Sequence, residues 1–135
     1  MATNLVTQTI NDGYRNTILK IDGYVNAADL TGSTVVDPSL LGQIDAQGTL
    51  SKIVRVKRIN FDIEDGLECD LIWDGATPQS LWRCTGRGEI KGKLFGGFPN
   101  NATTPNGKIT LTTEGGALAT TNLAFTIVLE VVKAN

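Results

Sequence analysis

The chain contains no histidine among its 135 residues, which narrows the chemistry that its side chains can perform. Histidine is the base of Ser-His-Asp and Cys-His nucleophilic pairs and a common ligand of zinc and non-haem iron. Two cysteines, Cys69 and Cys84, are too few for a structural zinc site or a disulfide scaffold. Cys69 falls on the apolar phase of its segment, so we expect free thiols buried in a core.

Carboxylates are the remaining candidates for chemistry, because a glycosidase needs only two and calcium prefers clustered oxygen ligands. Acidic residues crowd the segment 62–74, but no calcium-loop pattern fits them. Alternation gives a simpler interpretation, in which most of them are the outward positions of two strands. We therefore expect no enzyme, no catalytic residue, no metal and no cofactor. The acids are Asp62, Glu64, Asp65, Glu68, Asp70 and Asp74.

Basic residues form one cluster, at Lys52, Arg55, Lys57 and Arg58. The chain as a whole carries a formal net charge of −2, and no aromatic residues are interleaved with the cluster. We interpret it as a solvated strand face or a charged edge, and we expect neither nucleic acid nor a membrane as a partner. The start of the chain lacks the basic and apolar regions of a signal peptide, so we expect synthesis in the cytoplasm.

The elements that must carry these side chains are strands. Fifteen glycines and many Thr, Val and Ile residues argue against helices, and apolar residues alternate with polar ones in most segments. The sequence predicts an all-β fold: a single antiparallel β-sandwich, jelly-roll-like, that spans residues 1–135, with residues 1–10 as an N-terminal arm. About eight strands are expected, near 4–10, 15–25, 33–36, 50–64, 67–74, 80–85, 108–113 and 123–133.

The segment 50–64 changes its apolar phase at Lys57-Arg58. A strand can change phase only when a residue is inserted into its ladder, so we expect a β-bulge or a sharp bend there. Such a bend would let the strand pass from one sheet to the other. Asp65-Gly66 separates two alternating runs and predicts a hairpin between them.

Three further segments carry local predictions. The last strand is apolar on one face and partly apolar on the other, which predicts a central strand covered on both sides. The stretch 86–106 is rich in glycine and is expected to be a long loop. Asp37-Pro38-Ser39-Leu40-Leu41 predicts a helical turn within a segment that is otherwise loop.

Five apolar residues lie where a core cannot easily use them. Some belong to the terminal strand and the others to a glycine-rich loop, so they either close one end of the sandwich or contact another chain. Aromatic residues are enriched in interface cores, so both interpretations stay open. These candidate interface residues are Leu5, Val6, Ile10, Phe95 and Phe98.

Several phrases, in order along most of the chain, resemble a family of small β-sandwich proteins of tailed bacteriophages, the capsid decoration or cement type. They are Asp12-Gly13-Tyr14-Arg15-Asn16, Leu19-Lys20-Ile21-Asp22-Gly23, Leu71-Ile72-Trp73-Asp74-Gly75, Gly96-Gly97-Phe98-Pro99-Asn100 and Phe125-Thr126-Ile127-Val128-Leu129-Glu130. The resemblance implies an oligomeric virion structural protein on the capsid surface, which binds and stabilises the shell. Its partners would be the major capsid protein and further copies of itself, as a homodimer or homotrimer. The resemblance brings no catalytic residues with it.

Other functions remain open at this stage. A tail or neck protein of the virion would show the same pattern. A carbohydrate-binding module is the leading alternative from another class, with Trp82 and Tyr24 as its stacking platforms. A hydrolase that uses carboxylates alone would need two acids converging in a cleft.

Overall fold

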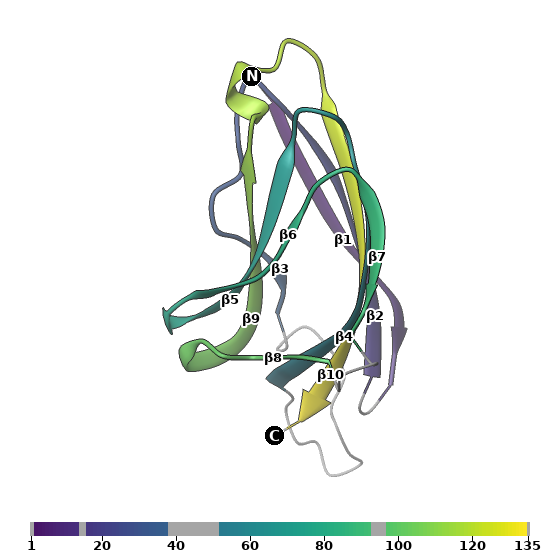
Figure 1. Cartoon of the computed structure of the whole chain (residues 1–135), viewed down its shortest axis with the longest axis vertical. Helices are drawn as coiled ribbons and strands as arrows, with labels where there is room; N and C mark the ends of the chain where they lie inside the picture. Colours follow the sequence, from purple (N-terminus) through teal and green to yellow (C-terminus); the bar gives the residue numbers. More distant parts are fainter. Residues whose placement is uncertain (1, 14–15, 38–51, 93–96, 135) are drawn as a thin grey trace.

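Two antiparallel sheets pack face to face in the computed structural model, which describes residues 2–13, 16–37, 52–92 and 97–134 (Figure 1). Within these residues the chain forms ten strands and one short 3-10 helix, η3. Their bounds are β1 (Ala2–Asp12), β2 (Asn16–Asn26), β3 (Ser33–Val36), β4 (Lys52–Ile63), β5 (Glu68–Thr77), β6 (Gln79–Cys84), β7 (Arg87–Lys91), β8 (Phe98–Pro99), β9 (Thr103–Glu114), η3 (Gly116–Leu118) and β10 (Leu123–Ala134).

The strand order is that of a jelly roll. One sheet, here called sheet A, has the order β1-β2-β10-β4-β7, with β8 also paired to β4, and the other, sheet B, has the order β3-β9-β5-β6. Early strands pair with late ones in nested fashion: β2 with β10, β3 with β9, β4 with β7, and β5 with β6. This nesting gives the two four-stranded layers of the fold, and β1 extends sheet A beyond β2. The predicted all-β sandwich is confirmed.

Alternation along the strands builds the core between the sheets. In β2 every second residue from Thr17 to Val25 is buried, and the residues between them are not. The same pattern in β5 buries Cys69, Leu71 and Trp73. The inward residues of both sheets form one continuous apolar cluster. Because side chains of a strand point alternately to its two faces, this single period fixes which residues meet.

The predicted bulge in β4 is confirmed. Arg58 pairs with Glu130 and Val56 pairs with Val131, so Lys57 is the inserted residue opposite β10. A second register break follows between the partners of Val132 and Lys133. The further expectation, that the strand would cross between sheets at the bulge, is wrong, because β4 stays in sheet A along its length. The inserted residue lets the apolar side chains on both sides of the bulge, Val56 and Ile59, point into the core from the same sheet.

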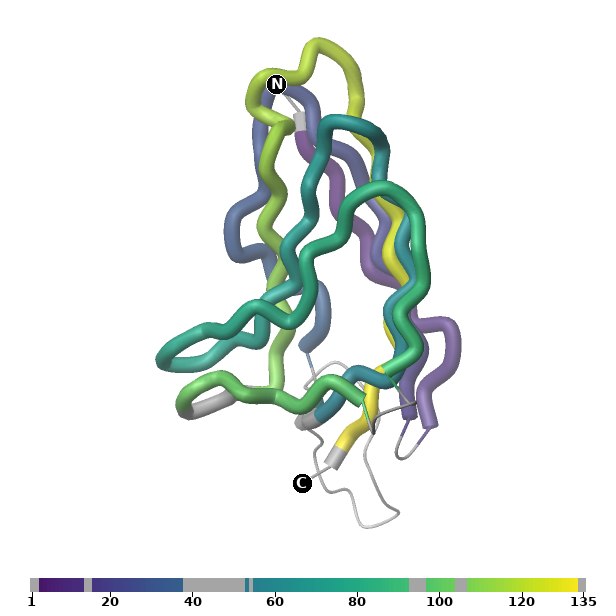
Figure 2. The backbone as a smooth tube through the Cα atoms, in the orientation of Figure 1, coloured from purple at the N-terminus to yellow at the C-terminus, as the bar shows by residue number. Residues whose placement is uncertain are grey.

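The predicted hairpin at Asp65-Gly66 is also wrong. The two residues do form a tight turn, with Gly66 at φ +89° and the Leu67 amide donating to the Glu64 carbonyl at 3.2 Å. However, β4 belongs to sheet A and β5 to sheet B, so the turn carries the chain across the top of the sandwich (Figure 2). A turn signal between two alternating runs sets a tight reversal, but it does not decide whether the runs pair.

The last strand, β10, lies at the centre of sheet A between β2 and β4, as expected. The expectation that it is covered on both faces is wrong for most of its length. Phe125, Ile127 and Leu129 are buried on the inner face, whereas Ala124 is exposed and Val128 is half-buried on the outer one. With only two layers, an outward valine is half-covered by its neighbours in the sheet.

The stretch 86–106, expected to be a long loop, contains strand β7, the two-residue strand β8 and the beginning of β9 within its described part. Charged side chains alternate with Gly88 and Ile90 in β7, so it lacks the apolar run that usually marks a strand. The predicted helical turn after Asp37 falls on residues 38–41, outside the described part of the chain. Among the residues that the structure describes, no helix is long and apolar enough to cross a membrane.

Candidate interaction surface

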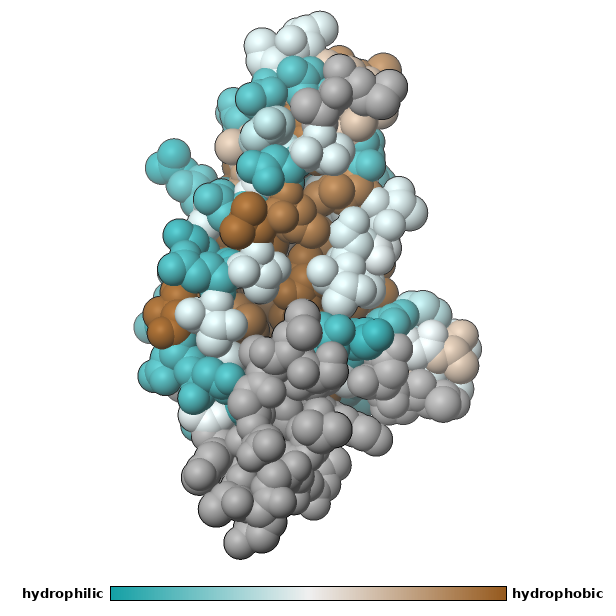
Figure 3. Space-filling view, turned by 180° about the vertical axis from the view of Figure 1, so that it is seen from behind, coloured by the Kyte–Doolittle hydropathy of each residue, from teal (hydrophilic) through white to brown (hydrophobic). Residues whose placement is uncertain are grey.

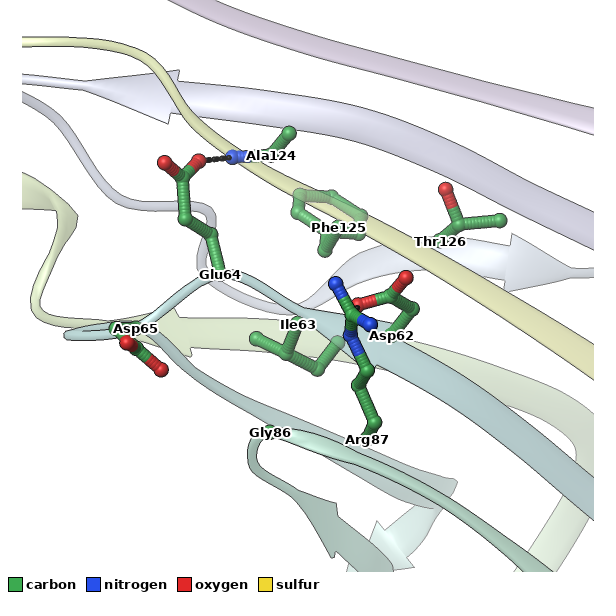
Figure 4. A pocket seen from close by; sticks show the side chains of 9 residues that line it. All are labelled: Asp62, Ile63, Glu64, Asp65, Gly86, Arg87, Ala124, Phe125 and Thr126. Atoms are coloured by element: carbon green, nitrogen blue, oxygen red, sulfur yellow. Dashed lines mark hydrogen bonds and ion pairs between the residues drawn. The ribbon is translucent and has the colours of Figure 1, made fainter.

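An open depression of about 690 Å³ lies where β4 ends and β10 begins (Figure 4). Its lining combines three acids from β4 and the turn that follows with one arginine from the start of β7. It is the most promising place for carboxylate chemistry in the described structure. The lining residues are Asp62, Ile63, Glu64, Asp65, Gly86, Arg87, Ala124, Phe125 and Thr126.

Two of the three acids of this depression are engaged with its walls. Asp62 accepts a hydrogen bond from Arg87 Nε at 3.0 Å, and the two side chains point toward each other in Figure 4. Glu64 accepts from the Ala124 amide at 2.8 Å, and its own amide donates to the Ala124 carbonyl at 3.0 Å. These bonds join β4, β7 and β10 at the end of sheet A. No group of three acids or cysteines in the described residues is placed to hold a metal ion.

The acids of β5 lie on the other sheet. Glu68 and Asp70 face outward and lie within 3.8 Å of the Arg83 guanidinium on β6, and Asp70 also accepts from Ser80. The interpretation of the acidic segment as outward strand positions is therefore confirmed for these residues and for Asp62. What looks like one cluster in sequence is divided between the outer faces of two sheets.

The basic residues of β4 lie in the interior of sheet A rather than at an edge, since β10 pairs on one side and β7 and β8 on the other. Arg55 is exposed, and Lys57 and Arg58 are half-buried. Arg58 Nε lies 3.8 Å from a Glu130 carboxylate oxygen on β10. The cluster is thus part of a mixed-charge outer face. The side chain of Lys52 lies outside the described part.

A buried cation lies at the opposite end of the sandwich. The Lys133 side chain is 0% exposed, and its ammonium donates to Asp12 Oδ1 at 2.5 Å. Thr17 Oγ1 donates to the same oxygen at 2.9 Å. The pair joins the end of β1 to the end of β10. Nothing in the sequence pairs these residues, because they are 121 positions apart.

The two cysteines are free and buried, as predicted. They lie opposite each other on β5 and β6. Burial raises the pKa of both thiols to about 12, and the Glu68 carboxylate beside Cys69 acts in the same direction. A thiol with such a pKa is a poor nucleophile at neutral pH.

The aromatic residues in the described part of the chain do not form one platform. Trp82 and Phe98 pack against each other, with ring centroids 5.5 Å apart, and both pack on the core. Tyr24 is half-buried on the outer face of sheet A, where it pairs with Ala124. The two stacking residues considered for a carbohydrate module therefore come from separate parts of the molecule.

Strand β1 presents most of its residues to solvent. It pairs with β2 along its length, so residues 2–10 of the stretch considered as an arm are part of sheet A. Every residue from Thr3 to Asp12 is exposed except Leu5, which packs against the core. Val6 is 54% exposed and Ile10 is 55% exposed. Seen from the side on which β1 and β3 end the two sheets, apolar surface shows between polar flanks (Figure 3).

A third exposed apolar side chain belongs to η3, which lies at the end of the molecule where β1 begins (Figure 1). Leu118 is 91% exposed. The turn that carries it is fixed by Asp29, which accepts from the Gly116 and Ala117 amides at 2.8 and 3.1 Å and from Thr113 Oγ1 at 2.9 Å. The sequence analysis missed this site, although Gly115-Gly116 marks a turn there.

The predicted interface residues thus have different placements. Val6 and Ile10 are exposed on β1, whereas Leu5 and Phe98 are half-buried against the core. Phe95 lies outside the described residues. Leu5, Val6 and Ile10 all lie on β1. Phe98 is separated from them, because it lies on β8 at the opposite edge of sheet A.

No protein-family model, no curated protein and no solved structure matches the chain.

Proposed function

We propose that the chain is a virion structural protein, a decoration or cement protein that binds the outside of a bacteriophage capsid and stabilises the shell. The phrases that resemble that family extend over both sheets, on β2, β5 and β10 and around β8. The resemblance implies a small β-sandwich, and this chain of 135 residues folds as a β-sandwich. This agreement supports the proposal.

The observation that carries the proposal is the character of the described surface. Its apolar side chains are presented from ordered elements, at β1 and at η3, while several acids are held by neighbouring groups of the same chain. Such a surface suits contact with another protein, because exposed apolar groups gain free energy when a partner removes them from water. A standard interface takes roughly 800 Å² from each partner, a modest part of a domain's surface.

The test is binding to capsids that lack the protein. Purified chain mixed with undecorated capsids is expected to sediment with them and to raise the temperature at which the shells disrupt. Leu118→Asp is expected to weaken binding, because it places a charge where an apolar contact would form. Thr120→Asp, at a neighbouring exposed position, serves as the matched control.

The outcomes separate the alternatives. Absence of a sedimenting complex at saturating protein would refute capsid binding. Co-sedimentation with purified tails or necks instead of capsids would move the chain to another part of the virion.

A further inference from the structure

The free edge of β1 differs from every other free sheet edge in the described structure. Its sequence, from Ala2 to Asn11, contains no charged residue and no proline, and the strand is eleven residues long. Proteins usually protect such edges with charges, prolines, bulges or short length, because unpaired backbone groups recruit another strand. In β1 the only register break lies near its end, between Thr9 and Asn11.

The other edges carry these protective features. In sheet A, the opposite edge consists of β7, with Arg87, Glu89 and Lys91, and of β8, which contains Pro99. In sheet B, β3 has four residues and a register break, and β6 has six residues and follows Pro78. The absence of protection is therefore confined to β1.

The backbone groups that face this edge can be identified. A Cβ added to Gly23 on β2 would collide with the Asn4 carbonyl oxygen, so the backbone groups of Asn4 face β2. Because successive residues of a strand direct their backbone groups to opposite edges, those of Thr3, Leu5, Thr7 and Thr9 face away from β2. β1 pairs with β2 alone, so these groups have no strand partner in the described structure.

We propose that β1 pairs antiparallel with β1 of a second copy of this chain, across a two-fold axis, to form one continuous sheet through a dimer. A second copy fits because it presents the same uncharged row, so no like charges meet. The contact is also self-complementary, as a two-fold axis requires. An acidic or basic partner strand would find no opposite charge between Ala2 and Asn11.

The free backbone groups also fix the register. With the axis at Val6, Thr3 pairs with Thr9 of the second copy and Leu5 pairs with Thr7, which uses every free group of this row. Val6 then lies opposite the second Val6. The two valines share the outer face of sheet A, since Val6 pairs with the outward Asp22 on β2.

Two proline variants test the edge. Thr7→Pro removes an amide that faces away from β2, so it is expected to abolish the dimer while the chain keeps its fold and the denaturation midpoint that the wild type has when diluted to monomer. Gln8→Pro removes an amide that faces β2 and is expected to lower the stability of the chain itself. Val6→Lys gives a second, independent block of the edge, and Leu118→Asp is expected to leave the dimer intact.

The measurement is molar mass by light scattering and sedimentation, from the highest soluble concentration downwards. Wild-type chain is expected at twice the 14.4 kDa mass of one chain, with dissociation on dilution because one strand pair is a small interface. A monomer at every concentration, a trimer, or a dimer that survives both Thr7→Pro and Val6→Lys would overturn the proposal. None of these results depends on whether the chain binds a capsid.

A cysteine at Val6 tests the register. Val6→Cys in a mild thiol–disulfide buffer is expected to give a disulfide-linked dimer, because each residue on the axis faces its own copy. Gln8→Cys would face Asn4 and is expected to cross-link much more slowly. Cys69 and Cys84 are buried and do not compete. Equal rates for the two variants would contradict the register.

Discussion

Lys133 carries its charge into a region that solvent does not reach. Removal of one partner from a buried ion pair withdraws the opposite charge from the group that stays behind, which costs more free energy than the pair contributes. Asp12→Asn is therefore expected to lower the free energy of unfolding by about 3 kcal/mol. Lys133→Met is expected to cost less, because the remaining Asp12 side chain is 25% exposed and keeps water as a partner. Urea denaturation of both variants measures the difference, and a larger loss for Lys133→Met would contradict this account.

The buried thiols make stability depend on pH in the alkaline range. An unfolded cysteine ionises near its ordinary pKa of 9.0, whereas the folded thiols keep their protons until about 12. The unfolded state therefore loses protons first, and the stabilisation from the raised pKa is present below pH 9 and is lost as pH rises toward 12. The expected loss between pH 8 and pH 10 is about 1.4 kcal/mol for each thiol.

The pH prediction is checked by urea midpoints under reducing conditions at both pH values. Tyrosine and lysine side chains also titrate in this range, so a variant with Cys69→Ala and Cys84→Ala provides the control. The wild type should lose more stability than this variant over the same interval. Equal losses would show that the thiols contribute nothing.

At the scale of elements, the bulge in β4 can be tested by deletion. Removal of Lys57, the inserted residue, leaves Val56 and Ile59 on the inner face, so the chain is expected to fold with a stability loss of about 1–3 kcal/mol. Removal of Asn60 shifts the strand by one residue and turns Ile59 outward and Arg58 inward. This second variant is expected not to fold. Circular dichroism and thermal unfolding distinguish them, and similar behaviour of both would exclude the bulge as the cause of the phase change.

The same strand shows what the sequence can and cannot predict. The phase change at Lys57 could be predicted because side-chain alternation is a local property, and the apolar faces of β5 and β10 could be predicted for the same reason. The sheet to which β5 belongs could not be predicted, because a tight turn at Asp65-Gly66 is compatible both with a hairpin and with a crossing between sheets. That choice depends on which strands cover the apolar faces, and the partners of β4 come from distant segments, β10 and β7.

The candidate surface was predictable only in part. Exposed apolar residues in β1 were evident because Val6 and Ile10 lie near the start of the chain among polar neighbours. Leu118 was missed, because one leucine between alanines carries no periodic signal. The position of Leu118 depends on Asp29, which accepts hydrogen bonds from the Gly116 and Ala117 amides. These residues are 87 and 88 positions away from Asp29 in the sequence. Contacts over such separations leave no pattern in a single sequence.

At the scale of the whole molecule, the order of the strands decides how the protein would respond to tension. β1 and β10 both pair antiparallel with β2, so they run in the same direction, and in Figure 1 β1 begins at one end of the long axis while β10 finishes at the other. A pull on the two chain ends therefore slides both strands along their neighbours. All ladder bonds, which lie perpendicular to the strands, are then loaded together instead of breaking one after another.

Mechanical strength along the long axis is the consequence. In single-molecule force spectroscopy, stretching from the chain ends is expected to need a higher rupture force than stretching between positions 2 and 26, at the open end of the β1–β2 pair, where that pair would open like a zipper. Equal rupture forces would contradict the sliding geometry. Under the proposed capsid role, a shell that must resist pressure from packed nucleic acid would benefit from a protein that is strongest in the direction in which it is stretched.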